Sequence, residues 1–353
     1  MKSTSLSPER ANQSASGSPD ALPASMRAIV QDRYGSEDVL QLRSIPLPEV
    51  GPREVLVRVR AAGLDRGVWH LMAGLPYLVR LGFGLRAPKD PVCGLDVAGR
   101  VVGLGSEVDQ FALGDEVYGI CSGSFAEFAS VPVEKLAPRP SNLSLEQAAA
   151  VPVSGTTALQ GLRDKGNLQP GQKVLILGAS GGVGSFAVQI ARAMGAEVTA
   201  VCSAAKAELV RALGAEHVID YRTEDFWTRG ESYDVILDVA GNHSLGHLRR
   251  ALTRRGTLVI TGGEGGDRWL GGTDRQLRAL ALSPFVSQSL RCFIADESAQ
   301  SLRELTELIE AGEVKPVIDR EFPLEQVPQA MRYLLDGQAR GKLVISVEEQ
   351  DGR

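Results

Sequence analysis

The chain has 353 residues, of which 43% are hydrophobic and 23% charged, a balance typical of a globular protein. This length exceeds what one compact core usually holds and predicts two domains. The net charge of −5 argues against a nucleic acid or an anionic membrane as the main partner, and no apolar run approaches the ~20 residues that cross a bilayer. The four cysteines are scattered without a C-x-x-C pair, so we expect a reducing, cytoplasmic compartment.

The N-terminal half predicts a polar tail followed by a β-rich domain. Residues 1–25 are rich in serine, proline and small polar residues and lack the apolar core of a signal peptide, so we expect a disordered tail. Short strands separated by glycine and proline then indicate a barrel-like domain. The expected strands cover residues 26–31, 39–43, 54–60, 96–104, 116–120 and 124–131.

From about residue 145 the pattern changes to an alternation of apolar strands and amphipathic helices. Such alternation predicts a parallel doubly wound sheet, so the fold class is α/β. Its expected strands are 173–177, 197–201, 217–219, 233–239, 257–261 and 290–294. A last strand at 342–347 has no partner in the alternation and should return to the β-rich domain. We therefore expect the β-rich domain to comprise residues 26–150 and 295–353, and the doubly wound domain residues 151–294.

A glycine-rich turn joins the first strand of this alternation to a helix. The turn reads Gly178-Ala179-Ser180-Gly181-Gly182-Val183-Gly184. Strand, turn and amphipathic helix together indicate a dinucleotide site, because the turn brings backbone N–H groups and a helix N-terminus against a pyrophosphate. Ala179 stands at the first position of the G-x-G-x-x-G pattern, so the turn must be built with a small side chain.

Several further motifs occur in order along nearly the whole folded chain. They read GRVVGLGS at 99–106, GDEV at 114–117, GSFAEF at 123–128 and GKLV at 341–344. With the glycine turn, this order resembles the medium-chain dehydrogenase/reductase superfamily. The resemblance implies a GroES-like catalytic domain, a Rossmann cofactor domain, and a cleft in which nicotinamide meets the substrate.

The positions of the zinc ligands distinguish the branches of that superfamily. Zinc alcohol dehydrogenases carry a cysteine and a Gly-His-Glu motif where this chain has Asp65 and Gly94-Leu95-Asp96. His70 and Cys93 are two scattered donors and do not make a tetrahedral site, and a buried apolar thiol is the alternative we favour for Cys93. We therefore expect no metal, and the chain resembles the zinc-independent quinone oxidoreductases.

The end of the second parallel strand bears on the choice of cofactor. An acidic residue there binds the ribose 2′-hydroxyl of NADH and repels a 2′-phosphate, but this strand leads into Cys202-Ser203-Ala204-Ala205-Lys206 without a carboxylate. The resemblance assigns Ser203, Lys206 and Tyr221 to the 2′-phosphate, which favours NADP(H). The alternative is a solvated lysine and a tyrosine packed at the surface.

Further cofactor contacts follow from position. The resemblance places Thr157 near the nicotinamide. Ala240, Gly241, Thr261 and Gly262 follow successive strands, at the edge where ligands bind in open α/β sheets. Phe293 and Ile294 either line the nicotinamide site or pack in the core.

The segment at residues 65–91 is the expected substrate side. Asp65 stands where many relatives carry asparagine, and it either orients the ribose, donates a proton or only caps the following helix. Tyr77 and His70 are further candidate proton donors. The large apolar residues here form either a pocket wall or a cover over the barrel; they are Trp69, Leu71, Met72, Leu75, Tyr77, Leu78, Leu81 and Phe83.

The sequence thus predicts an oxidoreductase that transfers a hydride from NADPH to a small molecule. Without zinc an unactivated alcohol is a poor substrate, whereas a quinone or an activated alkene or carbonyl delocalises the incoming charge itself. A 2-alkenal or an enoyl thioester is an alternative acceptor, and an NADPH-binding protein with little turnover is an alternative function. A homodimer through the exposed edge of the parallel sheet is a family-level expectation.

Overall fold

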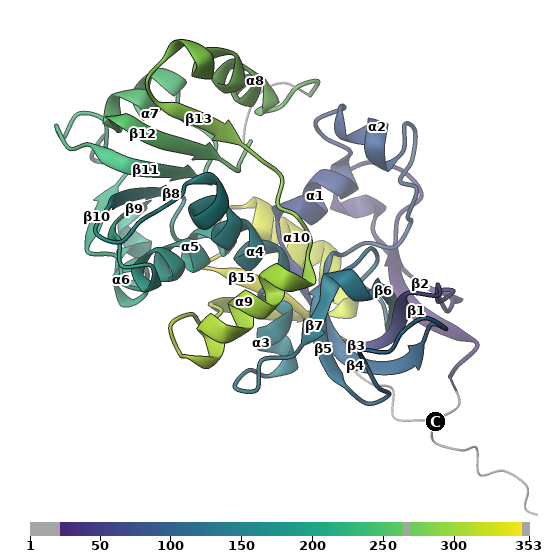
Figure 1. The fold of residues 1–353 in the computed structure, drawn as a ribbon. Helices are drawn as coiled ribbons and strands as arrows, with labels where there is room; N and C mark the ends of the chain where they lie inside the picture. The colour runs from purple at the N-terminus through teal and green to yellow at the C-terminus, as the bar shows by residue number, and fades with distance from the viewer. Residues whose placement is uncertain (1–21, 264–267, 348–353) are drawn as a thin grey trace, which may run out of the picture.

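The computed structural model describes residues 22–263 and 268–347, which form a β-rich domain and a parallel-sheet domain joined along one side (Figure 1). Residues 1–21 of the expected tail lie outside the described residues, and the first strand, β1, begins at Ser25. No helix in the described ranges is long and apolar enough to cross a membrane.

The β-rich domain is built on a mostly antiparallel sheet in the order β14-β15-β3-β4-β5-β7, with β6 also paired to β3. β3 is its centre, because it pairs with β4, β6 and β15. β1 (Ser25–Val30) and β2 (Gln41–Pro46) pair as a separate antiparallel ribbon, as expected. The other strands are β3 (Glu54–Leu64), β4 (Asp96–Leu104), β5 (Glu116–Ile120), β6 (Phe128–Pro132), β7 (Leu136–Pro138), β14 (Ile318–Pro323) and β15 (Lys342–Ser346).

The second domain holds a parallel sheet whose six described strands run in the order β10-β9-β8-β11-β12-β13. This order reverses direction between β8 and β11, and ligands of open α/β sheets bind beyond the carboxyl ends of the strands at such a point. β10 and β13 are the edge strands. The strands are β8 (Lys173–Leu177), β9 (Glu197–Cys202), β10 (His217–Asp220), β11 (Tyr233–Asp238), β12 (Leu252–Ile260) and β13 (Ser289–Cys292).

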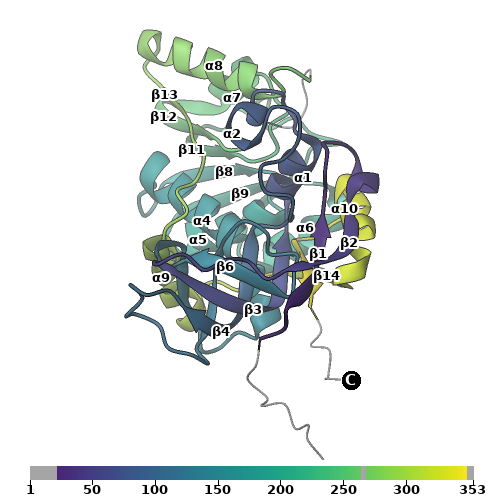
Figure 2. The ribbon, with the colours of Figure 1, turned by 90° about the vertical axis from the view of Figure 1, so that its right-hand side faces the viewer.

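Helices cover both faces of the parallel sheet and fill the junction between the domains. Apolar faces on α4, α5 and α9 bury Leu159, Phe186 and Leu305 in one continuous core with the sheet. In Figures 1 and 2, α1 and α2 rise from the β-rich domain towards α8. The helices are α1 (Arg66–Ala73), α2 (Val79–Phe83), α3 (Leu145–Ala149), α4 (Pro152–Gln160), α5 (Gly182–Ala193), α6 (Ala207–Ala212), α7 (Leu245–Ala251), α8 (Thr273–Leu282), α9 (Ala299–Glu310) and α10 (Val327–Leu335).

The C-terminal strand returns to the β-rich domain, which confirms the prediction for residues 342–347. β15 pairs antiparallel with β3, where Leu343 lies opposite Leu64. At its start the Gly341 N–H donates to the Ser180 carbonyl at 3.0 Å, so the strand also contacts the glycine turn of the other domain. The described fold is therefore the α/β combination expected from the sequence.

Candidate functional site

The shape of the glycine turn between β8 and α5 depends on Gly178. This glycine lies one position before Ala179, which stands at the first glycine position of the G-x-G-x-x-G pattern. Gly178 has a φ of 82°, which an L-residue rarely adopts, so Ala179 need not take the left-handed conformation. A Cβ on Gly184 would lie 2.2 Å from the Gly178 carbonyl oxygen, so α5 approaches the strand too closely for any side chain there. Gly181, in contrast, has free space and is the N-cap of α5.

A cavity of about 710 Å³ runs along this turn, from α6 and the segment after β10 to the first turns of α1 and α4. The cavity passes the N-terminus of α5, where free N–H groups favour an anion such as the phosphate of a cofactor. The residues predicted to bind the cofactor that line it are Thr157, Ser180, Gly181, Gly182, Val183, Lys206, Tyr221, Ala240, Thr261, Gly262 and Phe293.

Four residues predicted to bind the cofactor do not line this cavity. Ala179 is fully buried, and Gly184 packs against the Gly178 carbonyl. Ser203 is also buried, and the Gly241 N–H donates to the Asp238 carboxylate at 3.0 Å. Ala179, Gly184 and Gly241 thus shape the backbone around the cavity.

Lys206 lies at the end of the cavity beside Tyr221. Its Nζ donates to the Ala339 carbonyl at 2.6 Å and to the Gly337 carbonyl at 3.3 Å, so it is not the freely solvated lysine of the alternative interpretation. Burial lowers the pKa of Lys206, and the nearby Arg340 guanidinium lowers it further. The Lys206 ammonium and the neighbouring Arg340 guanidinium leave this end of the cavity electropositive and suited to a phosphate.

A cluster of three charged side chains, two of which line the first cavity, lies away from its Lys206 end. The Lys342 Nζ is 2.8 Å from the Asp96 Oδ2 and 3.3 Å from the Asp65 Oδ2. The Asp96 Oδ1 accepts the Val153 N–H at 2.8 Å, and the Asp65 Oδ1 accepts the Gly67 N–H at 2.8 Å. Asp65 therefore does cap α1, as one interpretation of the sequence predicted. Since both of its oxygens accept hydrogen bonds, the geometry fits a carboxylate better than a proton donor.

Burial dominates the electrostatics of this cluster. It raises the pKa of Asp96 to about 6, because Lys342 opposes the loss of solvation only in part and Asp65 adds to the rise. Burial lowers the pKa of Lys342, but the two carboxylates outweigh it and leave that pKa above its usual value. The cluster is thus held together by one buried ammonium between two acids.

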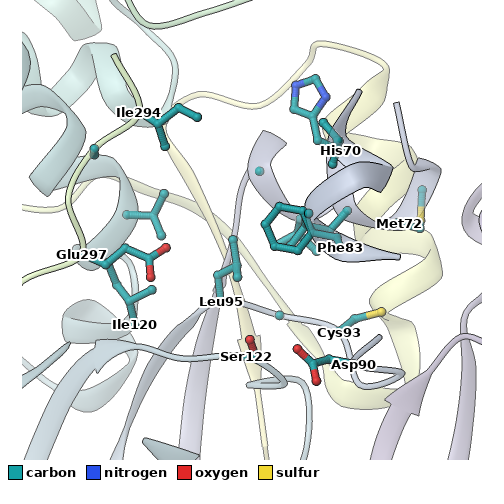
Figure 3. A pocket seen from close by; sticks show the side chains of 18 of the residues that line it. His70, Met72, Phe83, Asp90, Cys93, Leu95, Ile120, Ser122, Ile294 and Glu297 are labelled. Atoms are coloured by element: carbon teal, nitrogen blue, oxygen red, sulfur yellow. The ribbon is translucent and has the colours of Figure 1, made fainter. Parts of the chain in front are cut away.

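A second cavity, of about 730 Å³, lies between α1, α2, β13 and the segment after it. Most of its wall is apolar, with Cys93 at its base, where burial raises the pKa of the thiol to about 12. This agrees with an unreactive, apolar thiol. Figure 3 shows Phe83, Leu95, Ile120 and Ile294 around this cavity.

The apolar segment at 65–91 is divided between the two roles proposed for it. Leu71, Met72 and Phe83 line the second cavity, whereas Trp69 packs on the core of the β-rich domain. Leu78, Leu81 and half of Phe83 are exposed. The pocket-wall hypothesis therefore holds for part of the segment.

The two cavities share one wall. His70, Thr157, Phe293 and Ile294 line both of them. The His70 Nδ1 lies 2.7 Å from the Leu75 carbonyl oxygen; because a carbonyl only accepts, Nδ1 carries a proton and Nε2 is left for another partner. Figure 3 places this ring at the rim of the second cavity.

Tyr77 lies outside the linings of both cavities. Its ring contacts Trp269 edge to face at 5.2 Å between centroids, and the Arg80 guanidinium lies over it at 4.6 Å. Its N–H donates to the Arg268 carbonyl at 2.9 Å. This placement joins the two domains and gives no support to Tyr77 as a proton donor.

Among the described residues, two buried hydroxyls that line the cavities, and that the sequence does not single out, have no hydrogen-bond partner. Ser154 lines the first cavity and Thr156 the second, and both are at most 1% exposed. A Cβ on Gly182 would lie 3.0 Å from the Ser154 Oγ and 3.1 Å from the Lys342 Cδ, so this glycine keeps open a space bordered by polar groups. Buried hydroxyls usually find a partner, so both indicate where a ligand atom would bind.

The described residues contain no group of three or more His, Cys, Asp or Glu side chains placed to hold a metal ion. At the positions that correspond to zinc ligands, Asp65 and Asp96 both contact the Lys342 ammonium. The cation between these acids is therefore supplied by the chain itself.

Comparisons with known proteins agree with both domains. The family profile described as alcohol dehydrogenase GroES-like domain matches residues 51–141, and the profile described as zinc-binding dehydrogenase matches residues 213–345.

Individual relatives match over most of the chain. A 2-methylene-furan-3-one reductase from Solanum lycopersicum is 33% identical, over 92% of this chain and 80% of its own. The mitochondrial NAD(P)H oxidoreductase RTN4IP1 of Homo sapiens is 35% identical, over 91% of this chain and 89% of its own. The structure of a quinone oxidoreductase from Coxiella burnetii superposes with a TM-score of 0.78 at 27% identity, covering 92% of this chain and all of that one.

Proposed function

The chain belongs to the medium-chain dehydrogenase/reductase superfamily, with quinone oxidoreductase-like relatives, and from this premise we propose that it transfers a hydride from NADPH to a quinone or to an activated alkene or carbonyl. The main observation behind this proposal is that the two cavities share a wall. A cofactor in the first cavity and an acceptor in the second would meet at Thr157, Phe293 and Ile294. Bound there, the cofactor supplies the hydride.

The preference for NADPH over NADH rests on the end of the cofactor cavity near α6. β9 ends at Cys202 without an acidic residue that would repel a 2′-phosphate. Lys206 is held in place by two carbonyls, and Arg340 lies close enough to lower the pKa of Lys206. Gly181 and Gly182 leave room for the pyrophosphate at the N-terminus of α5.

The apolar wall of the second cavity suits an acceptor that delocalises charge over a conjugated system. Such an acceptor needs close approach and exclusion of water more than strong polarisation. The side chain of Thr156 lines this cavity, and its Oγ1 is buried without a hydrogen-bond partner. This hydroxyl can donate a hydrogen bond to an oxygen of the bound quinone, alkenal or carbonyl compound.

The reduced acceptor also needs a proton, and His70 is placed to hold one. Nδ1 is occupied by the Leu75 carbonyl, so only the doubly protonated ring can donate from Nε2. His70 lines both cavities, so that proton is available at the junction where the hydride arrives. A His70→Gln variant should retain cofactor binding and reduce acceptors more slowly.

The test is consumption of NADPH with a small panel of quinones and 2-alkenals, compared with consumption of NADH. We expect at least one acceptor of each type to be reduced, with NADPH preferred. If the protein binds NADPH tightly and reduces no acceptor, the reductase proposal fails and a binding function takes its place. Stoichiometric zinc in the purified protein would contradict the zinc-independent mechanism.

A further inference from the structure

The buried cluster of Asp65, Asp96 and Lys342 carries an excess of negative charge. The side chains are 12%, 0% and 1% exposed, so water screens them little. With both acids ionised, one ammonium faces two carboxylates and the cluster has a net charge of −1. Burying an unbalanced charge is costly, which points to a role beyond packing.

The cluster lies between the N-terminus of α5 and the shared wall, since a Cβ on Gly182 would lie 3.1 Å from the Lys342 Cδ. Asp65 and Lys342 line the cofactor cavity. Gly67, whose N–H binds the Asp65 carboxylate, lines both cavities. The Asp65 carboxylate is thus the member of the cluster beside the junction at which a hydride would pass, and away from the Lys206 end; Arg66, the next residue, also lines the first cavity.

We propose that this excess negative charge makes bound NADPH a stronger hydride donor. The reaction converts NADPH, a proton and the acceptor into NADP⁺ and the reduced acceptor. The C4–H bond of the dihydronicotinamide breaks, its electron pair and hydrogen pass to the acceptor, and the ring becomes positively charged. A fixed anion near the ring stabilises the oxidised, cationic form over the neutral one. Asp65 is in this proposal a positioning and charge-supplying residue. The proposal rests on the function proposed above.

The size of the effect follows from Coulomb's law in a partly buried site. One unit of charge within about 8 Å of another, at an effective dielectric constant of about 20–40, changes relative binding roughly fivefold to thirtyfold. The dihydronicotinamide ring of NADPH is neutral. The negative charge of the cluster should therefore change the affinity for NADP⁺ much more than the affinity for NADPH. The measurable quantity is the ratio of the two dissociation constants.

Asp65→Asn is the central variant. Asparagine caps a helix about as well as aspartate, and its amide oxygen can still accept a hydrogen bond, so α1 should keep its start. Dissociation constants for NADPH and NADP⁺ are measured by fluorescence titration and calorimetry without any acceptor. We expect NADP⁺ to bind about tenfold more weakly and NADPH to change by less than about twofold. Tenfold in this ratio corresponds to a rise of about 30 mV in the potential of the bound two-electron couple.

Two matched variants separate charge from structure. Asp109→Asn removes one exposed carboxylate that lines neither cavity, and should leave the ratio unchanged. Asp65→Glu keeps the charge and should restore the ratio to within about twofold, even if both affinities fall. Equal weakening of NADPH and NADP⁺ in Asp65→Asn would mean that Asp65 only shapes the site, and would overturn the proposal.

This measurement is independent of turnover. If no acceptor is reduced but the ratio shifts as expected, the charge effect stands and the reductase proposal fails. If acceptors are reduced and the ratio does not shift, the reductase proposal stands and this inference fails.

Discussion

The proposed cofactor cavity and the proposed acceptor cavity have similar volumes, about 710 and 730 Å³, but are built largely from different parts of the chain. The first follows a backbone turn, with glycines at the close approaches and charged groups at both ends. The second is enclosed mainly by apolar side chains from α1, α2 and the segment that follows β13. A site built from backbone geometry tolerates few sequences, whereas an apolar wall tolerates many. Cofactor choice is therefore constrained more tightly than acceptor choice.

The largest expected effect is on the glycine turn of the cofactor cavity. Gly184→Ala would place a Cβ 2.2 Å from the Gly178 carbonyl oxygen, and we expect the free energy of unfolding to fall by about 2–3 kcal/mol. Chemical denaturation without cofactor measures this. Gly181→Ala is the matched control, since the nearest atom to its Cβ is 3.5 Å away. It should unfold like the parent but bind NADPH more weakly. Equal stability of the two variants would contradict the close approach of α5 to β8.

The next largest effect is on the charged end of the same cavity. Lys206→Glu should weaken NADPH binding about a hundredfold and NADH binding only a few-fold, because only NADPH carries the 2′-phosphate. Titration of both cofactors checks this. Lys173→Glu, at the opposite end of β8, is the control and should change neither affinity. Equal losses for NADPH and NADH would rule out Lys206 as a phosphate ligand.

A smaller effect should separate the acceptor cavity from the cofactor cavity. Thr156→Val replaces a buried hydroxyl that has no partner, so stability should stay the same or rise slightly. The kcat/KM for a carbonyl-bearing acceptor should fall about tenfold while NADPH affinity is unchanged. Thr156→Ser keeps the hydroxyl and should restore most of the activity. A Thr156→Val enzyme as active as the parent would show that this hydroxyl does not touch the acceptor.

The smallest effect is the response of the charged cluster to pH. Asp96 has a pKa raised to about 6, so lowering the pH through that value adds a proton and takes the cluster from a net charge of −1 towards zero. NADP⁺ should then lose affinity relative to NADPH, by about threefold between pH 7 and 5. Both cofactors carry the same 2′-phosphate, so its titration cancels in the ratio.

Other titratable groups near the cluster must be separated from Asp96 in that measurement. Lys342 keeps its proton, because its pKa is raised by the two acids, and the Cys121 thiol stays neutral because burial raises its pKa. His70 is removed as a cause by working with His70→Gln. A ratio that stays flat through pH 6 in that variant would argue that Asp96 does not influence the nicotinamide.

The fold and the first cavity could largely be predicted from the sequence, because local residue patterns determine them. β4 and β5 agree with the predicted 96–104 and 116–120 at both ends, because each is a mainly apolar run that follows a glycine-containing turn. The cavity lined by Gly181 and Lys206 could be predicted from the sequence, because the proposed dinucleotide site requires particular residues at fixed spacing from a strand.

The rest of the site depends on contacts between distant segments. The sequence indicates only that Lys342 begins a strand. Its contacts with Asp65 and Asp96 form because the C-terminal strand pairs with β3. Ser154 and Thr156 are ordinary helix residues in the sequence, and only the packing of α4 leaves their hydroxyls without a partner. Tyr77 was chosen for its chemistry, but its ring packs on Trp269.

The most direct test of the central claim follows the hydride itself. NADPH labelled with deuterium at C4, in each of the two stereochemical forms, is incubated with the protein and a 2-alkenal, and the product is analysed by mass spectrometry and NMR. We predict that one form transfers its deuterium to the β-carbon of the alkenal and the other does not, because the cofactor lies in a fixed orientation across the shared wall. Product formed without deuterium at that carbon from either form, or no product despite tight binding of NADPH, would contradict the account.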